Sequence, residues 1–183
     1  AIIIPRKALN LLKATLPTEN TPVSIDFNLS NAYFKFGNIK MICRLIDERY
    51  PDYENVIPTS NPIKMTIGRT DLLSALKRIS IYANKTTHQV RIKITGSELQ
   101  ISAEDLDFSN EANERLSCEH EGEDIEIGFN AKFLIEMLNN IDSDQIKLTM
   151  SAPNKAGVIL PVDKDKTEDI LMLVMPVMLN QYV

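Results

Sequence analysis

Hydrophobic and polar residues alternate along several short segments of this chain, a pattern that predicts strands with one buried face. The alternating apolar positions are Val23, Ile25, Phe27 and Leu29; Ile92 and Ile94; Leu99, Ile101 and Ala103; Ile125, Ile127 and Phe129; and Ile146, Leu148 and Met150. Gly37-Asn38 and Gly96-Ser97 separate some of these segments. Because glycine adopts positive φ without steric cost, these pairs predict hairpin turns between antiparallel strands.

Apolar residues at helical spacing occur three times. The first segment, around Leu9, Leu12 and Leu16, follows Pro5-Arg6-Lys7; the second, around Leu72, Leu76 and Ile79, follows Thr70-Asp71; the third, around Phe133, Leu134 and Leu138, follows Asn130. Thr70-Asp71 and Asn130 are plausible helix N-caps. Many short antiparallel strands with few helices predict an α+β fold.

The three predicted helices mark an internal repeat. Ile4-Pro5-Arg6-Lys7, Ile67-Gly68-Arg69-Thr70 and Ile127-Gly128-Phe129-Asn130 occupy the same strand-to-helix junction, 63 and then 60 residues apart. Each unit is predicted to consist of a strand, a helix and about three further strands. A single unit could not cover both faces of its helix and sheet, so we expect units to pack side by side.

Proline residues indicate a domain boundary after the first unit. Pro51, Pro58 and Pro62 bracket residues 52–61, which carry no helix or strand pattern. We therefore expect one domain, or part of one, on either side of this stretch.

Composition is that of an ordinary globular chain: 183 residues, 44% hydrophobic, 25% charged and a net charge of −5. No apolar run approaches the roughly 18 residues that a membrane helix needs. The chain opens with Ala1-Ile2-Ile3-Ile4-Pro5, which resembles the middle of a strand, and we expect a fragment. Two cysteines, Cys43 and Cys118, are too few for a disulfide scaffold and favour a reducing cytoplasm.

The residues give little support for catalysis. Cys118-Glu119-His120 offers two metal ligands where a structural zinc site needs four, and His88 lies in a polar turn. The sequence has no nucleophile elbow, phosphate loop or dinucleotide motif. We expect no catalytic residues, metal or cofactor. A paired-carboxylate hydrolase stays open as an alternative without positive support.

Charge and hydrophobicity are unevenly distributed. Basic residues concentrate at two of the predicted helices: Arg6, Lys7 and Lys13; Arg69, Lys77, Arg78 and Lys85. The acidic total argues against a general nucleic-acid coat but allows a local basic surface. The C-terminal segment Leu173–Leu179 is apolar and rich in methionine, which suits either partner binding or closure of the core. Both interpretations remain open at this point.

Four motifs resemble one protein family. They are Ile4-Pro5-Arg6-Lys7; Arg44-Leu45-Ile46-Asp47-Glu48-Arg49-Tyr50-Pro51-Asp52-Tyr53; Ile127-Gly128-Phe129-Asn130; and Val174-Met175-Pro176-Val177-Met178-Leu179. In this order and spacing, over essentially the whole chain, they resemble the bacterial DNA polymerase III beta subunit, the sliding clamp.

The resemblance implies the DNA-clamp fold and a non-enzymatic role in DNA replication. Clamps of this family have three similar domains, each built from two repeats, and two subunits close a ring around duplex DNA. Residues 1–53 would then be the C-terminal half of the second domain and residues 54–183 the third domain. Helices line the hole of the ring, and Arg6 and Lys7 match positions that face DNA without reading its sequence.

The resemblance also implies a hydrophobic cleft that binds short linear motifs of the replicative polymerase, the clamp loader and repair proteins. The matching positions are Pro51, Val56, Asn130, Phe133, Leu173, Met175, Pro176 and Val177. The chain departs from the family at Met178, where a basic residue can occur, and in the tail Asn180–Val183.

Ile81 and Tyr82 match an apolar pair at the subunit interface of the family. Because the fragment would lack the first domain, which meets this pair in the ring, we expect it to be a monomer. Two rival functions stay open. A small α+β enzyme would show convergent titratable groups in a pocket between the domains, whereas a clamp would show an apolar cleft. An unrelated peptide-binding module is the third possibility.

Overall fold

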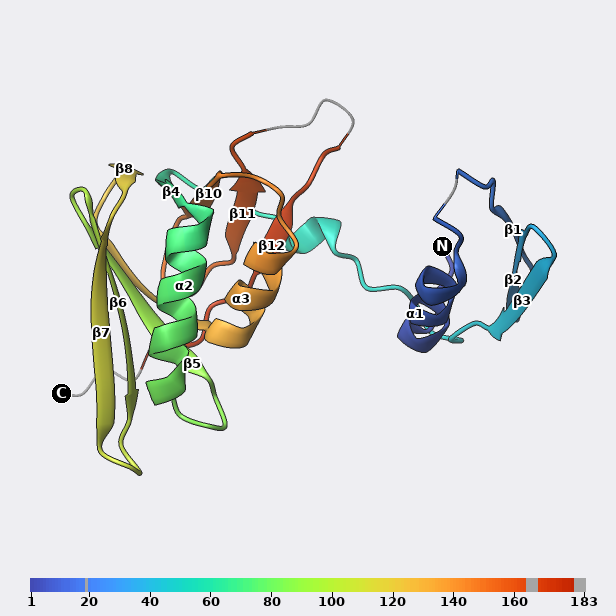
Figure 1. Ribbon diagram of the computed structural model, residues 1–183. Helices are drawn as coiled ribbons and strands as arrows, with labels where there is room; N and C mark the ends of the chain where they lie inside the picture. The colour runs from blue at the N-terminus through green and yellow to red at the C-terminus, as the bar shows by residue number, and fades with distance from the viewer. Residues whose placement is uncertain (19, 164–167, 180–183) are drawn as a thin grey trace. The chain divides into compact units, whose positions relative to one another are not determined.

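The computed structural model describes residues 1–18, 20–163 and 168–179 (Figure 1). The chain divides into two compact units, Ala1–Tyr53 and Glu54–Val183, called unit 1 and unit 2 below. Antiparallel sheets and a few helices make up both units, which confirms the predicted α+β class.

Unit 1 is one helix with one antiparallel sheet. Helix α1 (Arg6–Thr15) follows Pro5, and the strands β1 (Ser24–Phe27), β2 (Asn31–Phe36) and β3 (Ile39–Arg44) pair in the order β1-β2-β3. Gly37 has a φ of +51° in the β2–β3 turn, as the predicted hairpin requires. A single antiparallel bridge joins Ile3, before the helix, to Ile46, after the last strand.

The hydrophobic core of unit 1 is small. Its buried cluster is Ala32, Phe34 and Phe36, and every side chain of α1 is at least partly exposed. In the β1–β2 register, Ile25 lies opposite Phe34 and Phe27 opposite Ala32, so both share the face of the buried cluster. They are nevertheless 58% and 57% exposed. The predicted strand is present, but the buried face predicted for it is not covered in unit 1.

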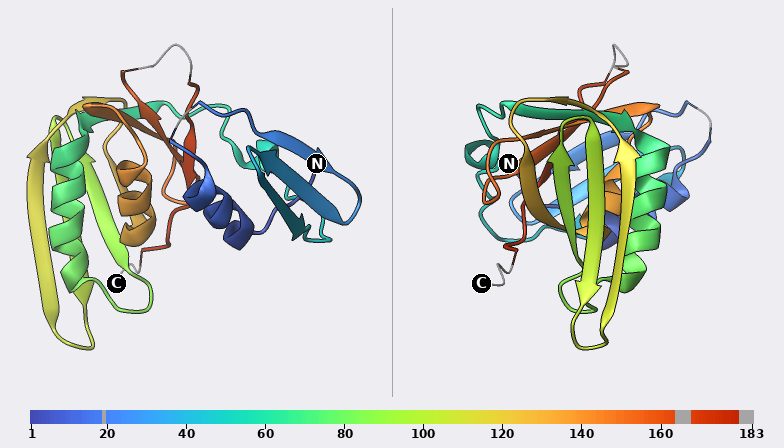
Figure 2. Two further views of the ribbon diagram at one scale, coloured as in Figure 1. Left: turned by 45° about the vertical axis from the view of Figure 1, so that its right-hand side comes forward. Right: turned by 90° about the vertical axis from the view of Figure 1, so that its left-hand side faces the viewer.

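Unit 2 contains two sheets and two main helices (Figure 1). In chain order its elements are η1 (Glu54–Val56), β4 (Ile63–Gly68), α2 (Arg69–Ile79), η2 (Ser80–Tyr82), β5 (Gln89–Thr95), β6 (Glu98–Asp105), β7 (Asn110–Ser117), β8 (Glu119–Glu121), β9 (Ile125–Asn130), α3 (Ala131–Asn139), β10 (Gln145–Met150), β11 (Gly157–Pro161) and β12 (Met172–Val174). The sheet orders are β12-β11-β10-β4-β8 and β7-β6-β5-β9. Helices α2 and α3 pack against each other, and Figure 2 shows α2 beside the four-stranded sheet.

The two sheets of unit 2 exchange strands. Strand β4, which leads into α2, pairs with β10, and β9, which leads into α3, pairs with β5. The exchange brings apolar residues of both repeats into one core, with Leu148 opposite Met65 and Ile92 opposite Ile127. The predicted packing of repeat units side by side is confirmed within unit 2.

The predicted N-cap is correct for helix α3 and wrong for helix α2. Asn130 caps α3 as predicted, because its Oδ1 accepts a hydrogen bond of 2.9 Å from the Lys132 amide. The prediction of Thr70-Asp71 as the cap of α2 is wrong, since that helix already begins at Arg69. Distant carbonyl groups hold this start: the Arg69 amide donates to Asp144 O at 2.9 Å and its Nε to Ser143 O at 2.9 Å. The alignment of the three junctions is also two residues out at the third one. Helices α1 and α2 begin at the third residue of their aligned segments, Arg6 and Arg69, whereas α3 begins at Ala131 and not at Phe129.

Candidate functional site

The C-terminal segment of the described chain crosses from one sheet of unit 2 to the other. Val174 ends β12 and lies opposite Gly157 of β11. Three residues later, the Val177 amide donates a hydrogen bond of 2.8 Å to the carbonyl oxygen of Gly128 in β9. A Cβ atom at Gly128 would lie 2.5 Å from the Val177 carbonyl oxygen. Glycine therefore permits this close approach, which seats the segment beside the start of α3.

The start of α3 presents one amide side chain and one aromatic ring. Asn130 is held from two sides, since its Oδ1 caps the helix and its Nδ2 donates to Thr87 O at 3.0 Å. Phe133 lies in the first turn of the helix and is 56% exposed. Helix α3 also packs against β12, which carries Leu173.

Six of the predicted cleft residues lie in unit 2 on segments that the Gly128–Val177 bridge and the contact between α3 and β12 join. They are Asn130, Phe133, Leu173, Met175, Pro176 and Val177, called the C-terminal surface below. Met175 is 57% exposed, whereas the neighbouring Val174 is 1% exposed. The apolar segment is thus divided: Val174 closes the core, whereas Met175 is exposed, and partner binding there stays a prediction.

The two remaining predicted cleft residues, Val56 and Pro51, lie on other segments of the chain. Val56 lies on η1 and is 50% exposed, and the bridge and the helix contact described above do not include it. Pro51 belongs to unit 1. Met178 is 72% exposed beyond the bridge, and the tail Asn180–Val183 lies outside the described residues.

A second exposed apolar group lies on η2. Ile81 and Tyr82 are 65% and 43% exposed, which leaves the predicted interface pair open on the surface of unit 2. Leu106 and Phe108, between β6 and β7, are 64% and 69% exposed and were not singled out from the sequence. In the sequence they form an apolar pair inside an acidic segment, Glu104–Glu111.

The structure changes the interpretation of the basic helices. In α2, Arg69 is bound to backbone carbonyls, and Arg78 donates to Glu114 of β7 at 3.1 and 2.5 Å. The hydrogen bond from Arg78 lowers the pKa of Glu114 below its ordinary value. Lys85 Nζ donates to Ile81 O at 3.2 Å, so three of the four cations assigned to this helix have structural partners. In α1, by contrast, Arg6 and Lys7 are exposed and the first turn has no acidic residue.

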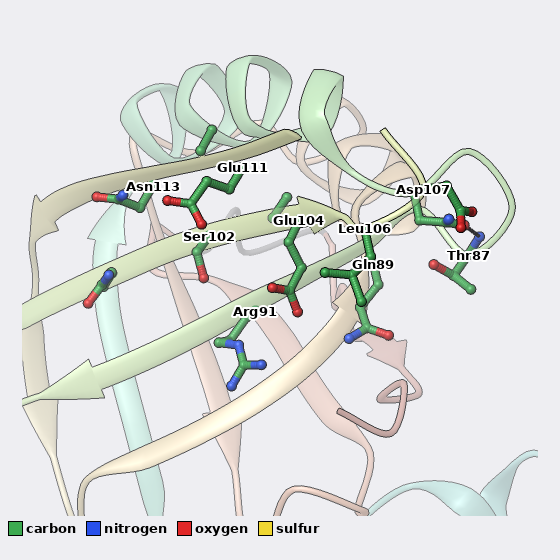
Figure 3. Close-up of a pocket in the computed structure, with 13 residues that line it drawn as sticks. Thr87, Gln89, Arg91, Ser102, Glu104, Leu106, Asp107, Glu111 and Asn113 are labelled. Carbon is green, nitrogen blue, oxygen red and sulfur yellow. Dashed lines mark hydrogen bonds between the residues drawn. The ribbon is translucent and has the colours of Figure 1, made fainter. Parts of the chain in front are cut away.

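A polar cavity of about 460 Å³ lies on the outer face of the four-stranded sheet of unit 2. Figure 3 shows Arg91, Ser102, Glu104 and Glu111 along its neighbouring strands. Arg91 forms an ion pair with Glu126. The residues that line the cavity include neither histidine nor cysteine, and its acidic side chains are Glu104, Asp107 and Glu111.

Cys118 and His120, the two metal-ligand types noted in the sequence, are held within the fold of unit 2. Cys118 is 8% exposed, and burial raises the pKa of its thiol. His120 Nδ1 lies 3.1 Å from Gly96 O. Within the described ranges, no three His, Cys, Asp or Glu side chains form a group that could hold a metal ion, and no helix has the length and apolarity needed to cross a membrane.

Comparison with known proteins decides the family. The DNA polymerase III beta subunit, C-terminal domain, matches residues 54–177, and the central domain of the same subunit matches residues 1–52. The chain belongs to the DNA polymerase III beta subunit family. The division between the two matches falls where the chain separates into units 1 and 2.

Individual relatives cover nearly the whole chain. It is 31% identical over 178 residues to the beta sliding clamp of Vibrio cholerae, which is 97% of this chain and 48% of that protein. It resembles the crystal structure of the beta subunit from Pseudomonas aeruginosa with a TM-score of 0.91 at 28% identity, over 97% of this chain and 48% of that one. A beta subunit structure from Bartonella birtlesii gives a TM-score of 0.85 at 29% identity, over 97% and 50% of the two chains. The chain thus spans about half the length of the beta subunits it matches.

Proposed function

We propose that this chain is part of a processivity clamp of a bacterial replicative DNA polymerase. The observation that carries the proposal is the match to two successive beta subunit domains along one chain. In this proposal residues 1–53 are the C-terminal half of the second clamp domain and residues 54–183 are the third domain. The complete protein encircles duplex DNA as a homodimeric ring, and Ile81 and Tyr82 lie at its subunit interface.

The clamp acts by topology and has no catalytic step of its own. A closed ring stays on DNA without a tight contact, so it can slide while it holds the polymerase. The polymerase, the clamp loader and repair proteins bind through short linear motifs at an apolar cleft. The C-terminal surface and Val56, which belong to unit 2, contribute to this cleft, which requires neither a metal nor a cofactor.

The chemistry of the C-terminal surface supports peptide binding. Phe133 and Met175 are exposed apolar side chains that could contact a leucine or phenylalanine of a partner, and a methionine adapts its shape to different ligands. Asn130 is fixed by its two hydrogen bonds, so its position is set before a peptide arrives. An apolar anchor beside a fixed polar group is a common arrangement in peptide sites.

Peptide binding is the first test of the proposal. A fluorescent peptide of about eight residues that carries Leu and Phe at its C-terminal end should bind with a dissociation constant between about 1 μM and 1 mM, measured by fluorescence anisotropy. The control peptide has both residues replaced by alanine and should bind at least about tenfold more weakly. Equal binding of the two peptides would contradict an apolar cleft.

DNA binding by this chain should be weak, insensitive to sequence and strongly reduced by salt, because it depends on phosphate contacts. The double variant Arg6→Ala/Lys7→Ala should reduce the slope of log affinity against log salt by about 1 to 2. The control is Lys35→Ala/Lys40→Ala, which removes the same charge from exposed positions paired across β2 and β3. Titration of a labelled duplex provides the measurement. An equal loss in both variants, or a preference for one DNA sequence, would contradict DNA contact by α1.

A further inference from the structure

The start of α3 is held by the loop between η2 and β5, called loop 84–88 below. Thr87 O accepts the hydrogen bond of 3.0 Å from Asn130 Nδ2, and His88 O accepts one of 2.8 Å from the Ala131 amide. The cap bond within α3 engages only the Oδ1 atom of the Asn130 side chain. The loop therefore determines how the Nδ2 group of Asn130 is held.

Loop 84–88 is shaped by the side chain of its first residue. Asn84 Oδ1 accepts hydrogen bonds from the amides of Thr86 and Thr87, at 3.0 and 3.2 Å, which closes a turn in the way asparagine often does. The Asn84 carbonyl oxygen accepts a third bond, of 2.8 Å, from the His88 amide. His88 has a φ of +50°, which a residue with a Cβ retains only where its surroundings hold it. Asn84 thus fixes the two carbonyl groups that hold α3.

Asn84 is in turn anchored on a buried carboxylate. Its Nδ2 donates to Asp105 Oδ1 at 3.4 Å, and the Asp107 amide donates to the same oxygen at 3.2 Å. Asp105 ends β6 and is 3% exposed, the one charged side chain that is buried in the described part of the chain. Burial of a carboxylate is costly unless hydrogen bonds compensate it. Since β6 lies inside its sheet, this bond ties loop 84–88 to a rigid strand.

The Asn84 side chain lies outside the C-terminal surface. Asn84, Thr87 and Asp107 line the polar cavity, and Figure 3 shows Thr87 and Asp107 at one end of it. Among the described residues, the hydrogen bonds of the Asn84 side chain go to loop 84–88 and to Asp105, and none goes to the C-terminal surface. A change at Asn84 therefore reaches that surface through the loop.

We propose that Asn84 is a positioning residue for peptide binding at the C-terminal surface. Asp105 holds Asn84, which sets the shape of loop 84–88. Thr87 O then orients the Asn130 amide before a peptide arrives. Without that support the amide rotates freely, and binding has to order it, which lowers affinity. The inference rests on the proposed peptide cleft and adds to it a residue that acts through Asn130.

A double-mutant cycle tests the proposal, with fluorescence anisotropy of the Leu/Phe peptide as the readout. Asn84→Ala should weaken binding about three- to tenfold. Asn130→Ser retains a helix cap but removes the Nδ2 group. In that background Asn84→Ala should change affinity less than about 1.5-fold, because the group that it positions is absent. The control Asn113→Ala removes an amide of β7 from the lining of the same cavity and should leave affinity unchanged.

Exchanging donor and acceptor provides a rescue. Asn84→Asp alone places two carboxylates side by side and should weaken binding at least as much as Asn84→Ala. The double variant Asn84→Asp/Asp105→Asn again sets a donor against an acceptor and retains acceptors for the two loop amides. Its affinity should return to within about twofold of the original chain. If circular dichroism shows that Asn84→Ala does not fold, Asn84→Asp takes its place in the cycle.

NMR of the free chain separates this inference from the proposed cleft. The Nδ2 protons of Asn130 should exchange with water at least about fivefold faster in Asn84→Ala than in the unaltered chain. Additive effects in the cycle, or unchanged exchange of these protons, would overturn the positioning role. If the unaltered chain does not bind the peptide, the proposed cleft is wrong, and the exchange of the Asn130 protons still decides whether Asn84 positions that side chain.

Discussion

Replacing Met175 by aspartate should abolish measurable binding of the Leu/Phe peptide while the fold of unit 2 is retained. Met175 is 57% exposed, so a carboxylate there is solvated in the free protein and costs little stability. When an apolar peptide side chain covers it, the carboxylate loses water without gaining a partner. We expect affinity to fall at least about 30-fold, measured by fluorescence anisotropy.

Two further variants distinguish loss of the cleft from a general effect of charge. Met175→Leu retains an apolar side chain and should bind the peptide within about threefold of the original chain. Leu106→Asp places the same charge at a position that is 64% exposed between β6 and β7. It should leave peptide affinity unchanged. If Met175→Asp binds as well as the unaltered chain, the cleft lies elsewhere on the molecule.

Gly128→Ala should displace the C-terminal segment and weaken both stability and peptide binding. The new Cβ would lie 2.5 Å from the Val177 carbonyl oxygen and 2.8 Å from Leu179 Cδ2. Since one of these contacts is backbone, the segment must move and the hydrogen bond from Val177 to Gly128 is lost. Overpacking of this kind costs about 1–3 kcal/mol, which urea unfolding measures directly.

The control for this variant is Gly96→Ala. Gly96 has a φ of +56°, and a Cβ there would meet nothing within 4 Å. Alanine at that position should therefore cost about 1 kcal/mol through backbone strain alone. Peptide affinity should fall in Gly128→Ala and stay unchanged in Gly96→Ala. An equal effect of both substitutions on affinity would mean that the bridge at Gly128 does not position the cleft.

Local patterns predicted the parts of the fold that depend on neighbouring residues. Alternation at Ile92 and Ile94 predicted a strand with a buried face, and both side chains are fully buried in β5. The cap at Asn130 was also predicted, because the hydrogen bond that it makes spans only two residues. Such features need no knowledge of distant parts of the chain.

Features that depend on distant residues were missed. The start of α2 is fixed by carbonyls of residues 138, 143 and 144, about 70 positions away in sequence, which no helix propensity includes. Alternation predicted a buried face for β1, yet Ile25 is 58% exposed, because burial depends on what packs against the strand and not on its own pattern.

The candidate site was found mainly through its resemblance to the family. The alternation and charge patterns alone left the C-terminal segment divided between core and partner binding. A glycine within the strand at position 128 was the one local signal of a close backbone approach. Only the bridge to Val177 showed which residues it brings together.

The most direct test of the clamp account is a titration of isotope-labelled chain with the Leu/Phe peptide, followed by backbone amide shifts in NMR. The account predicts shifts that concentrate at Val56, Asn130 and Phe133 and along residues 173–177, with little change on the outer face of β5–β7. Shifts that concentrate instead around the polar cavity at Ser102 and Glu104, or none at about millimolar peptide, would contradict the proposed cleft.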